Sequence, residues 1–328
     1  MDRSPQPGLI GLDWGTSSLR AYLHAPDGAV VERRAEPWGI QYLPHGGYAA
    51  AFRGVAGDWR DRWPEVPVLA AGMVGSRQGW REVPYVDCPA DPATIAAGIV
   101  EFATDCGTLH IAPGIAQTGA SPDVMRGEET QIVGAIVREP ALAADSLLVL
   151  PGTHCKWARI RNGRVVRFTT YLTGELFAML RDHSIIGRPA REARVAGAAG
   201  PGSAAFLRGV GTARDSGAEG IAGKLFTTRS LYLAGDVPVA DTLDYLSGLL
   251  VGEEIRSVLA GLGGACPPCV LLGEAGLCSR YREALAAFGV GQARALDETG
   301  PAGLWHIAVA AGLVPHSNAA PLEHSGRG

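Results

Sequence analysis

Asp13 opens the part of the sequence that is best suited to phosphate chemistry. It ends the apolar run 9–12 and is followed by Gly15, Thr16 and Ser17. A turn of glycine and small hydroxyl residues lets backbone amides and hydroxyl groups approach a phosphate closely. A carboxylate at the end of a strand can hold a water molecule of a Mg²⁺ ion that bridges phosphates. We therefore predict a phosphate-binding hairpin, with Asp13 as a metal ligand through water. The alternative is an ordinary hairpin with glycine in its turn.

Two adjacent carboxylates, Glu128 and Glu129, follow Gly127 at the start of a predicted helix. Acidic residues in a first helical turn are stabilised by the helix dipole, so a purely structural role is one interpretation. The other is chemical, because phosphoryl transfer to an alcohol needs a carboxylate within hydrogen-bonding reach of the attacking hydroxyl. We predict that one of these two carboxylates, Glu128 or Glu129, is this general base.

A polar loop after the apolar run 66–71 holds Arg77, Gln78 and Trp80. Domains of the α/β class place ligands at the carboxyl ends of strands. Arginine can bind a carboxylate through two hydrogen bonds, and the other two side chains can contact the hydroxyl groups and skeleton of a sugar. We therefore predict that this loop binds a ligand, with Arg77 able to bind a carboxylate. The predicted substrate-binding residues are Arg77, Gln78, Trp80, Tyr85, Arg126 and Glu129.

The opening pattern of strand, glycine turn, strand and hairpin returns at 147–171. This repetition of 9–36 indicates an internal duplication, with a second phosphate-binding hairpin at Gly152 and Thr153. The aspartate is absent from the second copy, so we expect His154 or Lys156 to supply the compensating polar contact. A solvated lysine is the alternative, since lysines are mostly exposed.

Hydrophobic periodicity predicts the remaining elements. Short apolar or alternating runs predict strands, three-to-four spacing predicts helices, and 114–125 is predicted to be a loop. We expect strands at 29–36, 66–71, 109–112 and 270–272, and helices at 48–63, 93–106, 125–139, 173–185, 241–262 and 302–313.

Composition limits the possible functions. The 328 residues suffice for two domains, and the net charge of −4 argues against a nucleic-acid partner. No run of about 18 apolar residues predicts a membrane span, and the N-terminus lacks an apolar signal region, so we expect a cytoplasmic protein. The six cysteines are expected to be reduced. Cys266 and Cys269 have CxxC spacing without a second metal-binding pair, which favours a structural or incidental role.

The stretch from Asp13 to Arg20 resembles the first phosphate motif of the actin, sugar kinase and Hsp70 superfamily. There an Asp-x-Gly-Thr/Ser turn joins the first two strands of a ribonuclease-H-like domain. The resemblance implies that Arg20 belongs to the phosphate site and that Gly273 and Gly276 form the adenosine loop. It also places Glu128 where several sugar kinases carry the base aspartate of a Gly-Asp-Gln turn, a departure in residue type.

Four longer motifs, GMVGSRQGW, MRGEETQ, LPGTHCKW and YLTGELFAMLRDHSIIG, occur in this order. Together they resemble the 2-dehydro-3-deoxygalactonokinase family over residues 9 to about 313. The resemblance implies transfer of phosphate from ATP, with Mg²⁺, to the terminal C6 hydroxyl of 2-dehydro-3-deoxy-D-galactonate. That reaction belongs to galactonate and thus galactose breakdown.

We therefore expect two ribonuclease-H-like (actin-like ATPase) α/β domains with a central nucleotide cleft, at 1–140 and 141–315, and a disordered tail at 316–328. The expected partner is a small sugar acid, and a homodimer is left open. Because the substrate implied by the resemblance carries a carboxylate, we predict Arg77 as the carboxylate clamp and Arg126 as its reserve. The alternatives are a kinase for another sugar or sugar acid, or a phosphatase or exopolyphosphatase of the same superfamily. A sugar-responsive regulator would carry a helix-turn-helix segment, which the sequence does not show.

Overall fold

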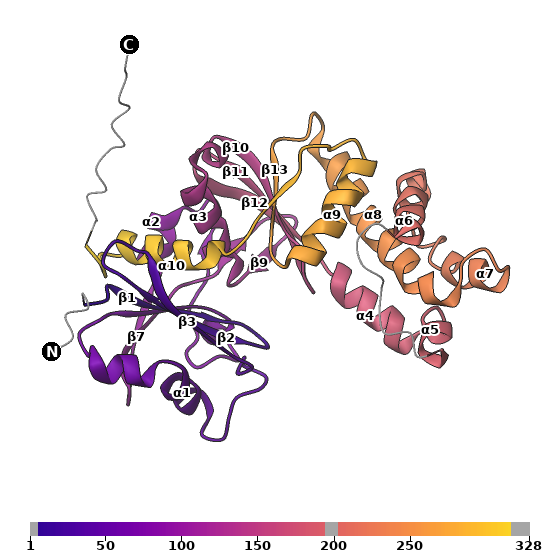
Figure 1. Ribbon diagram of the computed structural model, residues 1–328. Helices are drawn as coiled ribbons and strands as arrows, with labels where there is room; N and C mark the ends of the chain where they lie inside the picture. The colour runs from indigo at the N-terminus through magenta and orange to yellow at the C-terminus, as the bar shows by residue number, and fades with distance from the viewer. Residues whose placement is uncertain (1–5, 194–202, 316–328) are drawn as a thin grey trace, which may run out of the picture. The chain divides into compact units, whose positions relative to one another are not determined.

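The computed structural model describes residues 6–193 and 203–315 (Figure 1). The tail predicted to be disordered, 316–328, lies outside the described residues. Contacts divide the chain into two units, one formed by residues up to Pro140 together with those from Glu298 onward, and the other by Ala141–Asp297.

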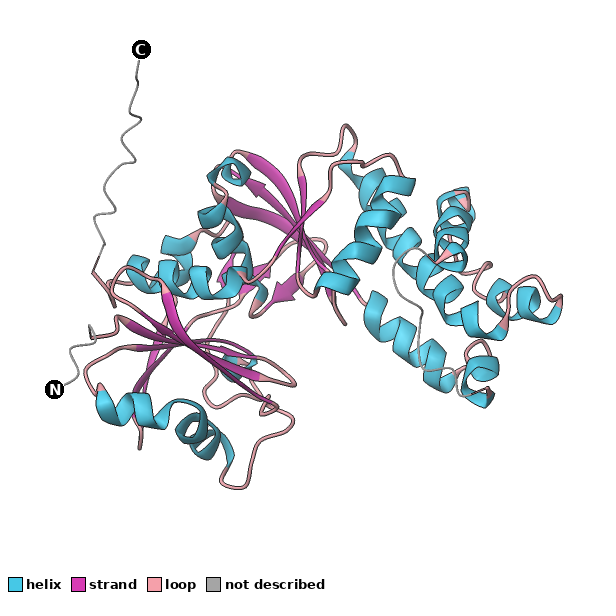
Figure 2. Ribbon diagram, viewed as in Figure 1, coloured by secondary structure: helices cyan, strands magenta, loops and turns pink. Residues whose placement is uncertain are grey.

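The first unit is built on a six-stranded sheet in the order β3-β2-β1-β4-β7-β6. β1 pairs antiparallel with β2 and parallel with β4, and β4 pairs parallel with β7. Figure 2 shows this sheet in magenta with helices on either side. Its strands are β1 (Leu9–Trp14), β2 (Leu19–His24), β3 (Val30–Glu36), β4 (Val68–Gly72), β6 (Val100–Thr104) and β7 (Gly107–Ile111).

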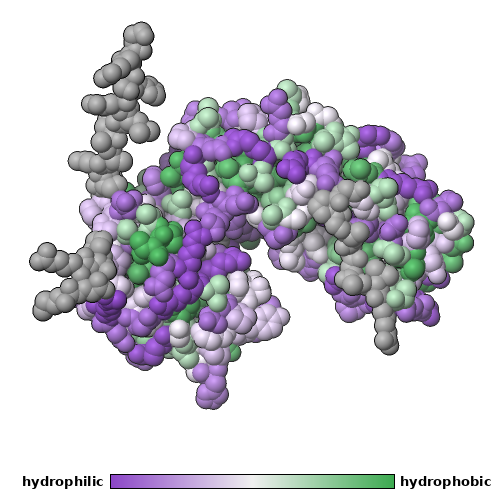
Figure 3. Space-filling model, viewed as in Figure 1, coloured by the Kyte–Doolittle hydropathy of each residue, from purple (hydrophilic) through white to green (hydrophobic). Residues whose placement is uncertain are grey.

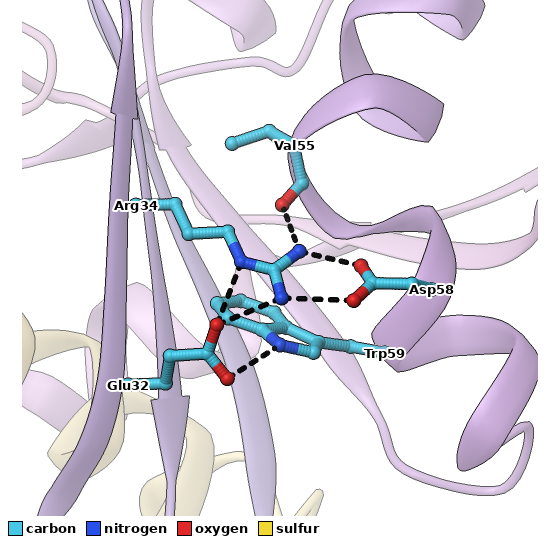
Figure 4. A network of polar contacts seen from close by, with 5 residues as sticks. All are labelled: Glu32, Arg34, Val55, Asp58 and Trp59. Atoms are coloured by element: carbon cyan, nitrogen blue, oxygen red, sulfur yellow. Dashed lines mark hydrogen bonds and ion pairs between the residues drawn. The ribbon is translucent and has the colours of Figure 1, made fainter.

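Helix α1 (Gly47–Arg62), predicted at 48–63, covers one face of this sheet. A polar network on the same face ties β3 to α1 (Figure 4). The guanidinium group of Arg34 pairs with Asp58 and Glu32 and lies 4.0 Å from the ring centroid of Trp59. The indole of Trp59 donates a hydrogen bond to Glu32. The network fixes the outer strand to the helix without contributing to the candidate site.

The opposite face of the sheet receives α3 (Glu128–Arg138) and α10 (Thr299–Ala310). These two helices lie side by side (Figure 1) because glycines allow their backbones to touch. A Cβ atom on Gly134 would lie 1.8 Å from the Thr299 carbonyl oxygen, and one on Gly303 would lie 1.7 Å from that of Thr130. The predicted second domain, 141–315, therefore extends too far, since its last helix packs within the first unit.

The second unit repeats the plan with a five-stranded sheet in the order β12-β11-β10-β13-β14. β10 pairs antiparallel with β11 and parallel with β13, as β1 pairs with β2 and β4. The duplicated ribonuclease-H-like topology expected from the sequence is thus confirmed. The strands are β10 (Asp145–Leu150), β11 (Cys155–Arg161), β12 (Arg164–Tyr171), β13 (Cys269–Leu272) and β14 (Arg294–Leu296).

Helix α8 is the central helix of the second unit. It forms at the position predicted, 241–262, and its residues Leu243, Leu246, Leu250 and Ile255 are buried. It packs closely on α6, where a Cβ atom on Gly248 would lie 2.0 Å from the Phe206 carbonyl oxygen. The helices are α4 (Thr173–His183), α5 (Arg188–Glu192), α6 (Ala204–Arg214), α7 (Thr227–Leu233), α8 (Thr242–Leu262) and α9 (Ala275–Ala287).

Two predicted elements of the first unit were wrong. The helix expected at 93–106 is a short helix, α2 (Pro92–Ala97), followed by β6, because Gly98 ends the helix and the next residues pair with β7. The loop expected at 114–125 contains β8 (Ile115–Gln117) and β9 (Asp123–Met125), which join β5 (Val86–Asp87) in a small sheet. The strands β5, β8 and β9 have only two or three residues each, too few to be recognised without their partners.

Hydrophilic and hydrophobic residues are interspersed over the face of the molecule seen in Figure 3. None of the helices in the described ranges combines the length and the apolar character needed to cross a membrane. Cys266 and Cys269 are free thiols, and Cys269 is buried at the start of β13.

Candidate active site

Asp13 lies near the end of β1, directly opposite Arg20 on β2. Its Oδ2 atom is 3.3 Å from a guanidinium nitrogen of Arg20, and 25% of the Asp13 side chain is exposed. Burial raises the pKa of Asp13, the Arg20 guanidinium group opposes that rise, and the Glu128 carboxylate adds to it. The two predicted catalytic carboxylates are therefore electrostatic neighbours, although 115 positions separate them in the chain.

Two glycines explain how the start of α3 reaches the end of β1. Gly72 ends β4 beside Trp14, and its φ of 96° places the backbone in a region that other residues avoid. Gly127 precedes α3 with φ 107°, and a Cβ atom there would lie 3.3 Å from the Cα of Gly72. The contact between these glycines brings the first turn of α3 next to the strand ends.

Glu128 and Glu129 differ in their access to solvent. Glu128 is half-buried, and its Oε2 atom accepts a 3.0 Å hydrogen bond from the Arg126 amide. Glu129 is fully buried, and its Oε2 atom accepts a 2.7 Å bond from the Gly127 amide. Burial raises the pKa of Glu129 to about 8, with a further rise caused by Glu128. Glu128 is therefore the carboxylate that an incoming hydroxyl group can reach.

The raised pKa of Glu129 predicts a pH-dependent stability. The pKa of Glu129 in the folded protein, about 8, exceeds the ordinary value of 4.5. The contribution of the protonated carboxyl group to the free energy of unfolding is therefore complete below about pH 4.5 and is lost as pH rises through about 8. We expect Glu129→Gln to lack this part of the decline and to be more stable than wild type at about pH 8. Urea unfolding of both proteins across this pH range measures the difference. If the free energy of unfolding fell equally with pH in both proteins, the raised pKa would not belong to Glu129.

A buried polar group lies beside the carboxylates. The Arg126 side chain is buried, donates a 2.7 Å hydrogen bond to the Val83 carbonyl and lies 4.2 Å from the Tyr85 ring centroid. Within the described residues, its Nε and Nη1 atoms lack hydrogen-bond partners, as do Ser76 Oγ and Glu129 Oε1. Buried polar atoms are nearly always satisfied, so this cluster is suited to a polar ligand or to water.

The other predicted substrate residues are placed differently. Arg77 and Gln78 are exposed, and the Gln78 carbonyl accepts a hydrogen bond from the Tyr48 hydroxyl. Trp80 stacks on Tyr48 with ring centroids 5.8 Å apart and contacts Trp14 edge-on. Its ring therefore packs against the hydrophobic core beneath α1, which is a structural role. Tyr85, by contrast, lies with Arg126.

The tip of the first hairpin is exposed at Thr16 and Ser17. Its backbone is fixed by the segment that contains Gly39, Ile40 and Gln41. The carbonyls of Gly15 and Thr16 accept hydrogen bonds from the amides of Ile40 and Gln41. A Cβ atom on Gly39 would lie 2.2 Å from the Thr16 carbonyl oxygen, so only glycine fits there. Sequence reasoning missed Gly39, because nothing in its neighbourhood connects it with residues 16 and 17.

The second hairpin is built against the start of α4. Gly152 faces open space, and Thr153 and His154 are exposed. The Thr153 carbonyl accepts a hydrogen bond from the Glu175 amide, and His154 Nε2 lies 2.6 Å from Glu175 Oε2. A Cβ atom on Gly174 would lie 2.4 Å from the Gly152 carbonyl oxygen, which explains the glycine of the Thr-Gly-Glu motif.

Lys156 is buried, 4% exposed, rather than solvated. Its Nζ atom lies 3.3 Å from the His154 carbonyl oxygen, to which it donates a hydrogen bond. The lysine thus supports the backbone of the hairpin in which the sequence lacks an aspartate.

A buried carboxylate that sequence reasoning missed lies beneath the second hairpin. Glu254 on α8 accepts hydrogen bonds from Trp157, Thr173 and Tyr281. The Tyr281 hydroxyl lies 2.8 Å from Cys155 Sγ, which in turn is 3.4 Å from both the amide nitrogen and the carbonyl oxygen of Gly152. The network joins α8, α9, β11 and α4 under the hairpin. No local motif marks Glu254, because its partners come from distant elements.

The predicted adenosine loop follows β13. Gly273 has φ 145° and faces Pro151 of the second hairpin. Glu274 caps α9 by accepting 2.7 Å hydrogen bonds from the amides of Gly276 and Leu277, and these bonds lower its pKa. The amides at the start of α9 are thus already occupied by a carboxylate. This loop is better suited to an uncharged group than to a phosphate.

Comparison with known proteins decides the family. Residues 13–307 match the model of a family described as 2-keto-3-deoxy-galactonokinase. The chain belongs to the 2-keto-3-deoxy-galactonokinase family. The resemblance found in the sequence is thereby confirmed.

Other members of this family align with this chain over most of its length. It is 38% identical to the "Probable 2-dehydro-3-deoxygalactonokinase DgoK1" of Rhizobium meliloti, covering 87% of this chain and 91% of that one. It is 35% identical to the 2-dehydro-3-deoxygalactonokinase of Escherichia coli, covering 85% and 90%. A crystal structure from Sinorhizobium meliloti, provisionally described as a 2-dehydro-3-deoxygalactonokinase, has a TM-score of 0.83 at 37% identity and covers 92% of this chain and 98% of that one.

Proposed function

We propose that this protein transfers the γ-phosphoryl group of ATP to the terminal C6 hydroxyl of 2-keto-3-deoxygalactonate, in galactonate breakdown in the cytoplasm. The names of its relatives support a kinase that acts on this sugar acid. The observation that carries the proposal is that Asp13 near the end of β1 and Glu128 at the start of α3 are electrostatic neighbours, within a chain of this family. A carboxylate for the metal and a carboxylate for the hydroxyl proton are the two acidic groups that such a transfer needs.

Glu128 is assigned the general base. It is half-buried and held by the Arg126 amide, whereas Glu129 is fully buried with a raised pKa. A group that stays protonated near neutral pH is a poor acceptor of a proton. Glu129 therefore serves to fix the turn before α3 through the Gly127 amide.

Mg²⁺ fits the acidic end of the site. Asp13 is partly exposed, and burial and the Glu128 carboxylate both raise its pKa, so a cation is the natural complement of this pair. Asp13 would hold the ion through water, and the bound ion would neutralise charge on the phosphates. The two hairpins, with Gly15, Thr16, Ser17 and Arg20 in one and Gly152, Thr153, His154 and Lys156 in the other, would bind phosphate, and the Gly273–Gly276 loop would bind adenosine.

A panel of acceptors tests the proposed function. The purified protein is incubated with ATP and Mg²⁺ and offered 2-keto-3-deoxygalactonate, its epimers, neutral sugars or no acceptor, and ADP formation is followed. We expect the galactonate derivative to have the highest kcat/KM. If ADP forms equally without an acceptor, water is the acceptor and the phosphatase alternative replaces the kinase. Homodimerisation stays a prediction to be checked by sedimentation.

The unsatisfied nitrogens of Arg126 lead us to assign it, ahead of Arg77, as the clamp for the substrate carboxylate. Loss of a charged hydrogen bond costs about 1.5–3 kcal/mol, so Arg126→Lys should reduce the preference for the acid about ten- to hundredfold. The readout is the ratio of kcat/KM for the sugar acid to that for its carboxyl-reduced analogue, which is insensitive to partial unfolding.

Arg77→Ala is the matched comparison, because Arg77 was the clamp predicted from the sequence and lies exposed on the neighbouring loop. We expect it to change the ratio little. If the ratio fell strongly in Arg77→Ala and was preserved in Arg126→Lys, the carboxylate clamp would be Arg77.

A further inference from the structure

An unusual group of arginines lies on strands β11 and β12 of the second unit, on positions other than those assigned to the second hairpin. In the pairing of β11 with β12, Arg159 stands opposite Arg167 and Arg161 stands opposite Arg164. Like charges placed directly opposite each other on neighbouring strands destabilise a sheet. Two such pairs in succession therefore need a compensating negative charge.

The protein itself supplies only part of that charge. Asp145 on β10 is 2.6 Å from an Arg159 nitrogen and 3.7 Å from one of Arg161. Arg167 is exposed and has no hydrogen-bond or ion-pair partner within the described residues. Asp145 thus serves both Arg159 and Arg161, while the Arg167 side chain is exposed.

A hollow opens beside these side chains, between this face of the sheet and the last turns of α8. Its volume is about 280 Å³, and its lining includes Arg159, Arg161, Arg167, Trp157, Tyr171 and Ser257. The Tyr171 hydroxyl donates a 3.1 Å hydrogen bond to Ser257, and both residues belong to the lining, so hydroxyl groups lie in the hollow together with the arginines. The hollow therefore offers cationic, hydroxyl and aromatic surface to one ligand.

Other charges at the hollow do not cancel its sign. α8 ends at Leu262, which is also in the lining, so the partial negative charge of the helix end is directed there. That charge amounts to about half an elementary charge. Among the described residues, the lining carries three guanidinium groups and no carboxylate, and Asp145, Glu253 and Glu254 lie nearby but outside it. The hollow keeps a net positive charge, and arginine is the side chain that best binds planar or tetrahedral oxyanions.

We propose that this hollow is a binding site for a small organic polyanion, a molecule with two or more carboxylate or phosphate groups on a short carbon skeleton. The oxyanion groups would bind Arg159, Arg161 and Arg167, and the skeleton would lie against Trp157 and Tyr171. Asp145 occupies part of the cationic surface as an internal competitor of the ligand. The proposed arginine ligands are not residues assigned to the transfer reaction, although Trp157 in the lining also donates a hydrogen bond to Glu254 beneath the second hairpin.

Calorimetric titration of the full-length protein at low ionic strength tests this site. The probes are 3-phosphoglycerate and the tricarboxylate tricarballylate, with glycerol as the neutral control. We expect binding of at least one polyanion, weakened about tenfold or more by Arg167→Ala, and no binding of glycerol. A preference for the first probe identifies a phosphate ester as the ligand class, and a preference for the second identifies a polycarboxylate.

The decisive variant is Asp145→Asn, which removes the competing carboxylate and should tighten polyanion binding severalfold, opposite to the effect of Arg167→Ala. Arg188→Ala is the matched control, since it removes an exposed arginine of the same unit that pairs with Glu192. Binding that is unchanged in both Arg167→Ala and Asp145→Asn, or weakened equally by Arg188→Ala, would overturn the proposal. So would the absence of binding of either polyanion.

Discussion

Glu128→Gln should keep the fold and lower kcat by about 10²–10⁴, the usual loss when a general base is removed. Glutamine keeps an oxygen that can accept the hydrogen bond from the Arg126 amide, so the turn before α3 is retained. It cannot take the proton of the attacking hydroxyl. KM for ATP should change little, because the assigned role concerns the acceptor and not the nucleotide.

Glu129→Gln is the matched control for this result. The two carboxylates are adjacent, both begin α3, and both accept a backbone amide hydrogen bond. Steady-state kinetics of the two variants at several pH values distinguish them. A loss of 10² or more confined to Glu129→Gln, with Glu128→Gln near wild type, would move the base one residue along the helix.

Asp13→Asn should lower kcat by at least about a hundredfold and shift the Mg²⁺ dependence to higher concentrations, because the carboxylate that positions the metal is lost. The variant should not be destabilised. The raised pKa of Asp13 means that its ionised form weakens the fold, and asparagine removes that charge. Turnover measured over a series of Mg²⁺ concentrations, with thermal unfolding as the check on folding, gives both quantities.

Arg20→Gln separates the metal role of Asp13 from its ion pair. The Arg20 side chain is 54% exposed, so removing its 3.3 Å contact with Asp13 should cost little stability. We expect a smaller loss of kcat than in Asp13→Asn. If Asp13→Asn retains near-native turnover at every Mg²⁺ concentration, Asp13 does not position the metal.

The sequence by itself determined the duplicated architecture and the family. Strand and turn patterns repeat at 9–36 and 147–171, and both copies fold with the same strand order and directions. This succeeded because alternating apolar residues and glycine turns are local signals, readable within a few positions. The same locality explains the failure at 93–106, where Gly98 and a partner strand outweigh helical periodicity.

Only the tertiary structure decided which polar residues act together. Glu128 could not be distinguished from Glu129 in the sequence, since burial depends on what packs over a side chain. Arg126 is preferred to Arg77 as the clamp for the substrate carboxylate because Val83 and Tyr85 hold its guanidinium group in the interior.

The same limit applies to the supports beneath the hairpins and to the last helix. Glu254 is joined to Trp157 and Thr173 across gaps of 97 and 81 positions. Residues 299–310 belong to the first unit because Gly134 and Gly303 let α10 and α3 touch. Side-chain types and local spacing name the candidates for chemistry, but burial and contact between distant segments assign each its role, and those follow from three-dimensional packing.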